Sequence, residues 1–274
     1  MHPRHEALVA RFLEVAKVDD RLAAVALVGS NSTGTADDHS DLDLILVTYD
    51  TAFDEFIAGR DSFLASVGEP LFVESWSRVE RWFFVFADGG DGELTVIRAD
   101  AVHRAFDAQF VTLLDKRGIL QSVQPSPPSS RLAGPQELLD IQRRLTGFWH
   151  DYAHFVTAWS RGQWWWANGQ LEVLRGMCAN LLRINANPTD PEVGEEPYWK
   201  VELTLPVAEL ARLAPTLNTL EPDSMLASAR ALASLHREVG QRIAQRHSLA
   251  YPEALESIVL ARLDGPPDAR GSTH

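Results

Sequence analysis

The hydrophobic residues of this chain change their spacing once, at a stretch rich in proline and serine from Gln124 to Ser130. Before it, short apolar runs alternate with amphipathic helical segments. After it, apolar residues recur every three or four positions, which is typical of helices. Pro and Ser at this density are typical of an extended linker. We therefore expect an α+β fold: a mixed β-sheet with flanking helices, followed by an α-helical bundle.

The expected boundaries follow from this change of pattern. We predict a sheet-containing domain over residues 1–121, a linker over 122–134, a helical domain over 135–264 and a flexible tail over 265–274. The spacing predicts strands at 22–28, 42–47, 71–73, 81–86 and 93–97, with helices at 5–18 and 51–67. In the second half it predicts helices at 138–159, 164–184, 222–246 and 252–263.

Charge and composition exclude several kinds of partner. The formal net charge is −13, which disfavours nucleic acid, because binding to a phosphate backbone is driven by Lys and Arg. No apolar run is long enough for a membrane span, and the N-terminus has no apolar signal region, so we expect a cytoplasmic protein. The single cysteine, Cys178, forms no internal disulfide. The acidic surface fits a cationic small molecule or serves solubility alone.

Two carboxylates lie side by side in the second predicted strand. Asp41 and Asp43 are two residues apart, so they project from one face, while Leu42 and Leu44 point into a core. Two like charges so placed repel each other unless a cation lies between them. Carboxylate oxygens suit Mg²⁺ or Mn²⁺. We predict that both residues are catalytic and bind metal; a solvated sheet edge is the alternative.

A loop with a phosphate-binding pattern precedes this pair. Gly29 and Ser30 end the first predicted strand, with Asn31 beside them. Glycine lets the backbone approach a ligand closely, and the serine hydroxyl adds a donor. We predict that these three residues bind the triphosphate of a nucleotide, because such a loop beside a metal-binding pair is what nucleotidyl transfer needs.

Glu93 is the best candidate for a third acid. It opens an apolar strand directly after a turn, in a position to pair beside the strand of Asp41. We predict that it is a metal ligand, a general base for an acceptor hydroxyl, or both. A solvated glutamate at the end of a turn is the alternative. Asp100 and Asp107 are weaker candidates for the base.

At these residues the chain resembles the DNA polymerase β-like nucleotidyltransferases, which carry Gly-Ser, then Asp-x-Asp, then a later strand carboxylate. The run from Arg21 to Asp43 looks like the antibiotic nucleotidyltransferases of lincosamide and aminoglycoside type. In the second half, Phe148-Trp149, Arg161-Gly162-Gln163 and the run 171–175 are similar to the helical domain of lincosamide nucleotidyltransferases and of the related streptomycin adenylyltransferases.

The resemblance implies an enzyme that moves a nucleoside monophosphate, AMP in the first instance, from an NTP such as ATP to a hydroxyl of a small molecule. It implies Asp41 and Asp43 as Mg²⁺ ligands, with Glu93 as the third acid. We accordingly predict that residues 1–121 are the nucleotidyltransferase catalytic domain and that the helical domain 135–264 binds the acceptor. The acceptor stays open: the acidic charge fits an aminoglycoside, and the helical half resembles lincosamide enzymes. A protein or unknown-metabolite acceptor, a catalytically silent nucleotide-binding module and a homodimer also stay open.

One departure from the family concerns charge. The family loop often carries a basic residue after the serine, whereas residues 31–33 are neutral here. The triphosphate then needs counter-charge from elsewhere. Five arginines are candidates: Arg81, Arg98, Arg143, Arg144 and Arg175.

Aromatic and histidine residues of the helical half are candidates for binding the acceptor. Three consecutive tryptophans, 164–166, cannot share one helix face, so we expect at least one to be exposed, and we name Trp165. His150 and His154 lie one turn apart, which suits an acceptor-binding edge, a metal pair or a solvent-facing pair. Packing between helices is the alternative for the tryptophans.

Overall fold

The computed structural model describes residues 2–75, 80–106, 109–124, 133–188, 193–194 and 196–264. The chain divides into two compact units, Met1–Ser129 and Ser130–His274. The division falls inside the predicted linker 122–134. Most of that linker, the candidate base Asp107 and the whole predicted tail 265–274 lie outside the described residues.

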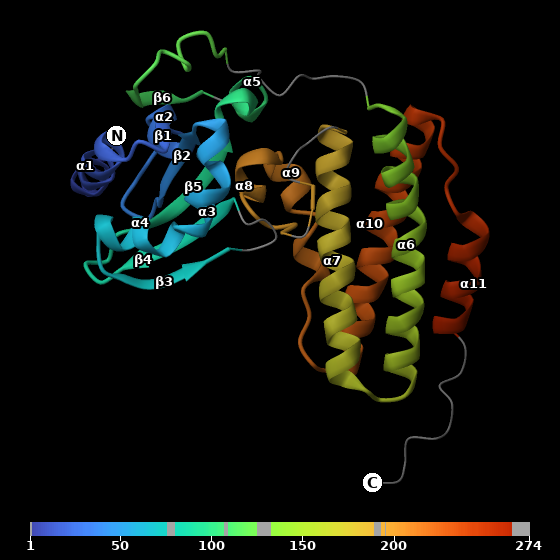
Figure 1. Cartoon of the computed structure of the whole chain (residues 1–274). Helices are drawn as coiled ribbons and strands as arrows, with labels where there is room; N and C mark the ends of the chain where they lie inside the picture. Colours follow the sequence, from blue (N-terminus) through green and yellow to red (C-terminus); the bar gives the residue numbers. More distant parts are fainter. Residues whose placement is uncertain are drawn as a thin grey trace. The chain divides into compact units, whose positions relative to one another are not determined.

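The first unit is a six-stranded sheet with helices around it (Figure 1). Its elements are α1 Pro3–Val18, β1 Leu22–Leu27, α2 Gly29–Thr33, β2 Leu42–Thr48, η1 Asp50–Ala52, α3 Phe53–Ala58, α4 Arg60–Val67, β3 Pro70–Glu74, β4 Arg81–Phe86, β5 Asp91–Arg98, η2 Ala99–Ala101, α5 Val102–Ala105 and β6 Val111–Asp115.

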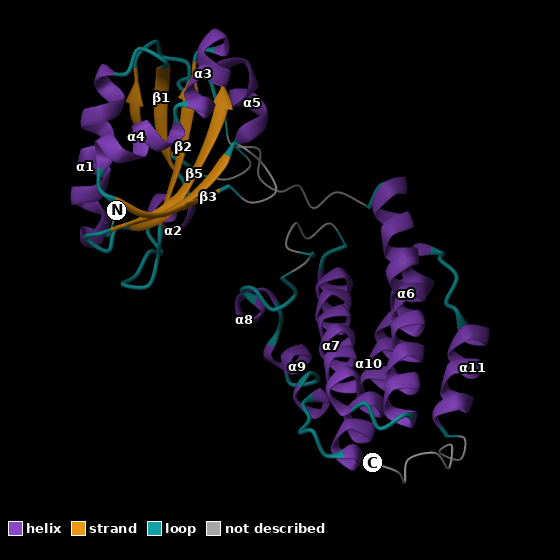
Figure 2. Ribbon diagram, turned by 60° about the horizontal axis from the view of Figure 1, so that its bottom comes forward, coloured by secondary structure: helices purple, strands orange, loops and turns teal. Residues whose placement is uncertain are grey.

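The sheet is mixed, as expected. Its strand order is β3-β4-β5-β2-β1-β6, and only the pairing of β2 with β5 is parallel among these neighbours. Figure 2 shows the strands with helices packed along them. One face carries Leu42, Leu44 and Leu46 into a core beneath α1 and α4. The opposite face carries Ile45 and Val47 into a smaller core that includes α5.

Alternation along β2 explains how the site is oriented. Leu42 and Leu44 are buried in the larger core, so Asp43 between them projects from the other face. Helix α1 presents an apolar stripe of Leu8, Phe12 and Ala16 to the same core, at the spacing of three to four residues that one helix face requires.

The structure differs from the sequence prediction at several glycine- or loop-rich places, three of which concern the sheet and its flanking helices. The helix expected over 51–67 is broken at Gly59 into α3 and α4. Strand β6 is additional to the predicted strands. Gly92, expected in a turn, belongs to β5, because a side chain there would lie 2.2 Å from the Leu42 carbonyl oxygen of β2. The glycine therefore lets β2 and β5 approach closely, and the turn itself lies at Gly89, whose φ is +83°.

The second unit is helical over its described residues (Figures 1 and 2). Its elements are α6 Pro135–Ser160, α7 Trp164–Ala186, α8 Val201–Thr204, α9 Val207–Leu210, η3 Ala214–Thr216, α10 Pro222–His247 and α11 Glu253–Leu263. Proline in the first turn of α6 and α10 is tolerated because those positions need no N–H donor.

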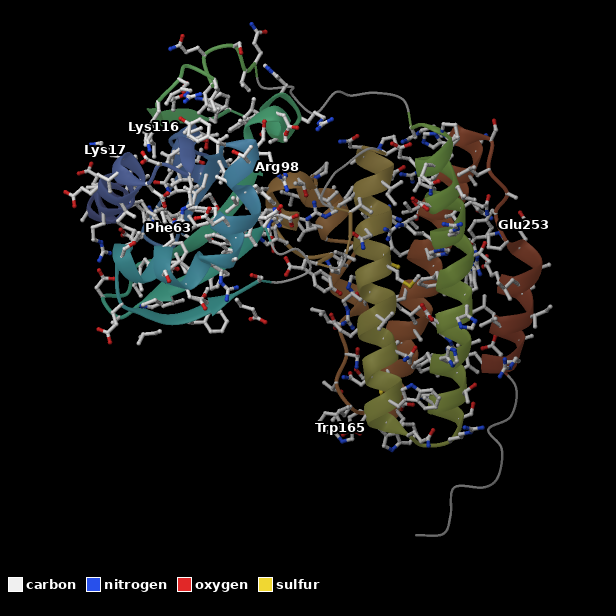
Figure 3. All side chains as sticks on the ribbon, viewed as in Figure 1. Lys17, Phe63, Arg98, Lys116, Trp165 and Glu253 are labelled. Atoms are coloured by element: carbon white, nitrogen blue, oxygen red, sulfur yellow. The ribbon has the colours of Figure 1, made fainter. Side chains whose placement is uncertain are left out.

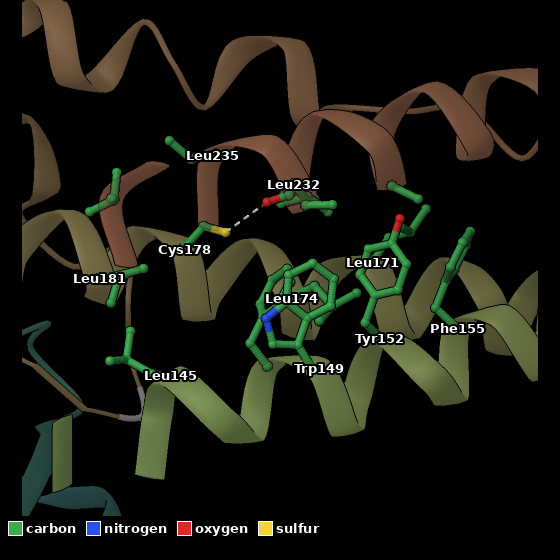
Figure 4. Close-up of a cluster of buried hydrophobic side chains, with 14 of the residues drawn as sticks. Leu145, Trp149, Tyr152, Phe155, Leu171, Leu174, Cys178, Leu181, Leu232 and Leu235 are labelled. Atoms are coloured by element: carbon green, nitrogen blue, oxygen red, sulfur yellow. Dashed lines mark hydrogen bonds between the residues drawn. The ribbon is translucent and has the colours of Figure 1, made fainter. Parts of the chain in front are cut away.

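A single large core joins these helices. Figure 4 shows Trp149 and Tyr152 of α6, Leu174 and Cys178 of α7 and Leu232 of α10 packed together. Helices α6, α7, α10 and α11 match the predicted ranges closely. In α6, α7 and α10 the apolar residues repeat with the helical period over many turns. No helix among the described residues combines the length and the apolar character that crossing a membrane requires.

Candidate active site

The two strands that carry the predicted acids are direct neighbours. Asp43 of β2 and Glu93 of β5 are register partners in the parallel pairing, and Asp41 lies immediately before β2. Register partners in a parallel pair lie on the same face, with strand axes about 4.8 Å apart. The charge of Asp41 reaches Glu93, since it is one cause that raises the pKa of that carboxyl. The fold thus brings the three acids to one face of the sheet.

Gly29 lies directly against Asp43. Its φ is +62°, and a Cβ added at this position would lie 2.0 Å from Oδ2 of Asp43. The backbone N–H of Val28 also donates to the Asp43 carbonyl at 3.1 Å. Only glycine leaves room for the carboxylate here. The predicted Gly-Ser motif and the predicted acid pair are therefore adjacent parts of one site, with Gly29 exposed and Ser30 half-buried beside it.

Asn31 has a buried side chain that is only 3% exposed. Its Nδ2 donates to the Asp41 carbonyl at 3.1 Å, and its Oδ1 accepts from the backbone N–H of His2 at 3.1 Å. The same Oδ1 lies 3.2 Å from Nδ1 of His5. The side chain predicted to bind nucleotide therefore ties α1 to the start of the Asp41 segment. Sequence reasoning misses His5, because a lone histidine on the apolar stripe of α1 belongs to no motif.

Glu93 is paired with an arginine. Its Oε1 lies 2.9 Å from Nε of Arg81 on β4, and the side chains are 32% and 60% exposed. Burial raises the pKa of Glu93; the charge of Arg81 opposes this rise and that of Asp41 adds to it. A carboxylate with a raised pKa is a stronger base.

Among the ion pairs of the described residues, Arg81 is the one candidate arginine that contacts a predicted acid. Arg98 pairs with Asp54, and Arg143 with Asp140.

The neutral residues of the loop after Ser30 form hydrogen bonds within the protein. Ser32 Oγ donates to the carbonyls of Gly29 and Gln109 at 2.8 and 2.9 Å. Residues 31 and 32 thus hold the loop in shape.

The other candidates belong to other elements of the chain. Asp100 follows the far end of β5, seven residues beyond Glu93, and its N–H donates to Asp50. His150 and His154 are exposed on α6 with their Nε2 atoms 3.3 Å apart. Trp165 is 78% exposed at the start of α7, as expected for one of the three tryptophans (Figure 3). Acceptor binding by His150, His154 and Trp165 stays a prediction.

The donor set suits a hard divalent cation. Asp41 and Asp43 offer carboxylate oxygens, and Gly29 has no side chain that would occupy the space of the Asp43 carboxylate. Glu93 is held by Arg81, and within the described ranges no three His, Cys, Asp or Glu side chains gather as a ready-made metal site. Mg²⁺ commonly takes one or two carboxylates and completes its shell with water and substrate phosphates. The acids present fit that pattern.

Two solved structures are similar to this chain at low sequence identity. An aminoglycoside 6-adenyltransferase from Bacillus subtilis aligns over 96% of this chain and 98% of its own, with 17% identity and a TM-score of 0.41. A nucleotidyltransferase-like protein from Exiguobacterium sibiricum 255-15 aligns over 95% and 89%, with 11% identity and a TM-score of 0.40. No curated relative matches the chain.

The family model for streptomycin adenylyltransferase matches residues 3–264. The match covers both the sheet with its three acids and the helical unit, and it confirms the resemblance to antibiotic nucleotidyltransferases. The chain belongs to the streptomycin adenylyltransferase family.

Proposed function

We propose that this nucleotidyltransferase transfers AMP from ATP, with Mg²⁺, to a hydroxyl of an aminoglycoside-type antibiotic. The observation that carries the proposal is the close approach of Gly29 to Asp43, with Glu93 in register beside it. The family description names both an adenylyl group and streptomycin, which favours AMP and an aminoglycoside over a lincosamide.

Each acid has a separate role in this proposal. Asp41 and Asp43 would hold the metal, and the exposed backbone at Gly29 with the Ser30 hydroxyl would position the triphosphate. When bound, Mg²⁺ supplies positive charge that polarises the phosphate oxygens and stabilises the leaving pyrophosphate. Arg81 would add the positive charge that residues 31–33 lack, since its side chain is exposed and adjoins the acids.

Glu93 is the proposed general base. The acceptor oxygen attacks the α-phosphorus of ATP, the bond to the bridging oxygen of pyrophosphate breaks, and the hydroxyl proton passes to Glu93. The raised pKa of Glu93 favours this role, because proton transfer is most effective when the pKa of the base lies near the working pH. Pyrophosphate leaves, and AMP stays on the acceptor oxygen.

Substitution of the metal-binding acids tests the proposal. Asp41→Asn and Asp43→Asn should each lower transfer of label from α-phosphate-labelled ATP to streptomycin by about 100-fold or more, because several kcal/mol of charge stabilisation are lost. Asp61→Asn is the matched control, since Asp61 is an exposed aspartate of α4 outside the site. Full magnesium-dependent transfer in both site variants would contradict the proposal.

A further inference from the structure

Two exposed histidines of α6 bring the same ring atom close together. The Nε2 atoms of His150 and His154 lie 3.3 Å apart, and the planes of the two rings cross at 86°. The residues are four positions apart on a helix, so their side chains are neighbours on one face. No step of the proposed function uses either residue. The pair is therefore a cluster of ring nitrogens whose role is open.

The core of the helical unit holds the pair in place. His150 and His154 lie well inside α6, where the helix is regular. On the inner side of the same turns, Trp149 and Phe155 are fully buried in that core. Close packing of these large side chains keeps α6 from rotating about its axis. The backbone of the pair is therefore fixed, and a ligand has only the side-chain torsions of the two rings to set.

The short separation leaves few ways to place protons on the two rings. Two protonated rings would bring like charges together, and two N–H groups that face each other would repel. Without a metal, one neutral ring has to donate to the other across 3.3 Å, which is longer than the usual hydrogen bond of about 2.9–3.0 Å. A metal ion uses the lone pairs of both nitrogens at once, since neutral imidazole is a common metal ligand.

The separation of the nitrogens also matches a particular coordination geometry. Zn²⁺ binds imidazole nitrogen at about 2.0–2.1 Å, so two nitrogens at a tetrahedral angle lie about 3.3–3.4 Å apart. A square-planar ion with bonds of that length would need them about 2.8–3.0 Å apart. The observed 3.3 Å fits the tetrahedral arrangement. Histidines at positions i and i+4 of a helix are also a spacing by which helical motifs bind zinc.

The donor atoms decide which ions the pair accepts. Imidazole nitrogen suits Zn²⁺ and its neighbours among the transition metals, whereas Mg²⁺ prefers oxygen. Asp41 and Asp43 offer oxygen alone, so the two sets of donors favour different ions. The formal net charge of −13 attracts cations to the protein in general. Selection of zinc over magnesium therefore comes from the ring nitrogens and not from the charge.

We propose that His150 and His154 form a two-ligand site for Zn²⁺ on the surface of α6. Among the residues that the structure describes, no three His, Cys, Asp or Glu side chains gather around a metal position, so water fills the rest of the tetrahedral shell. The proposal does not rest on the proposed function, because neither histidine belongs to the unit that carries the acids.

A tryptophan beside the pair offers a local probe. The centroid of the Trp166 ring lies 6.3 Å from that of His154, and the ring is 41% exposed. Cu²⁺ binds the same nitrogen donors, more tightly than Zn²⁺ does, and it quenches the fluorescence of nearby tryptophans. Quenching of Trp166 therefore indicates a metal ion at this site.

Calorimetry on the full chain, without an added histidine tag, tests the site with ZnCl₂ as the probe. Millimolar Mg²⁺ in the buffer occupies the carboxylates. His150→Ala and His154→Ala should each weaken the Kd for zinc at least about tenfold, and the double variant should bind no worse than either, because a chelate is lost with one ligand. Alanine favours helix, so α6 should persist. His103→Ala, at an exposed histidine of α5, is the matched control and should keep the Kd.

Fluorescence locates the ion independently. Cu²⁺ should quench the native chain more than Trp166→Phe, and Trp166→Phe should keep the native Kd for zinc. Absence of zinc binding at submillimolar concentration, or a native Kd in both single histidine variants, would overturn the site. Equal quenching of the native chain and Trp166→Phe would do the same. Loss of streptomycin binding in the two histidine variants of a chain that binds no zinc would assign the pair to the acceptor instead.

Discussion

At the scale of single residues, Gly29 is the position where the backbone is most tightly constrained by the site. It combines a positive φ with a close approach to Asp43, whose Oδ2 would lie 2.0 Å from an added Cβ. These are two separate requirements. The first is met by glycine because residues with a Cβ rarely adopt this conformation, and the second because the carboxylate occupies the space.

Substitution can separate the two requirements. Gly29→Ala should lower nucleotidyl transfer by about 100-fold, because displacing Asp43 by about 1 Å misplaces the reacting groups. Gly89→Ala is the matched control: Gly89 also has a positive φ, +83°, but nothing lies within 4 Å of an added Cβ. Both variants should lose about 1 kcal/mol of stability to backbone strain. Equal transfer by the two variants, measured at saturating ATP, would show that the contact with Asp43 is unimportant.

Some residue roles follow from the sequence and others do not. The alternation of a strand predicts that Asp41 and Asp43 share a face, and the packing of Leu42 and Leu44 agrees with it. The pairing of Arg81 with Glu93 joins different strands, and only the register of β4 on β5 creates it. The burial of Asn31 depends on α1, which lies 26 residues away at His5. Contacts between residues so far apart in the chain leave no pattern in the local sequence.

At the scale of elements, the packing of α10 against α6 buries a histidine. His236 stacks on Phe148 with ring centroids 3.9 Å apart, and its Nδ1 lies 3.5 Å from the Tyr251 hydroxyl. Burial lowers the pKa of His236 to about 3. The folded state therefore keeps this ring neutral, while the unfolded chain protonates it below its ordinary pKa of about 6.5.

The sign of the pH effect follows. As pH falls through about 6.5, the unfolded state gains a proton that the folded state does not, so stability is lost until the folded pKa is reached. Between pH 7 and pH 5, His236 alone should cost about 2 kcal/mol. Urea unfolding followed by circular dichroism should show this loss in the native chain and much less of it in His236→Leu. His103→Gln, at an exposed position, should keep the full loss; the same loss in His236→Leu would contradict the assignment.

Helices and strands were predicted correctly where the spacing of apolar residues repeats over several turns, and were missed where the segment is too short for the spacing to repeat. Helices α6, α7 and α10 show the helical period of apolar residues over many turns. Strand β6 is short and only partly buried, so it lacks a clear alternation. The five-residue α2 is too short to show a period, and its sequence of glycine, serine, asparagine and threonine is that of a turn.

At the scale of the whole molecule, each unit has a core of its own. The helical core includes Leu145, Leu174 and Leu232, and the sheet has a separate core on each face. The change of hydrophobic spacing predicted two regions of different class. It could not predict that Asn180 and Arg183 of α7 bind the segment after that helix, because these contacts join residues 14 to 21 positions apart.

The reactivity of the single cysteine measures how tightly the helical core is packed. Cys178 is fully buried, its thiol lies 3.7 Å from the Leu232 carbonyl (Figure 4), and burial raises its pKa. Alkylation by iodoacetamide needs an accessible thiolate. The native protein should therefore react at least about 1000-fold more slowly than the protein in urea, as measured by intact mass. Equally fast labelling in native buffer, with the helical circular dichroism retained, would contradict this packing.

The way α7 holds the segment of Tyr198 and Trp199 has a consequence for how that segment tolerates substitution. Tyr198 and Trp199 are exposed on a segment that Asn180 and Arg183 hold mainly through backbone carbonyls. Backbone carbonyls are the same whatever side chains the segment carries. Substitutions of the side chains at these two positions should therefore leave the path of the segment's backbone unchanged.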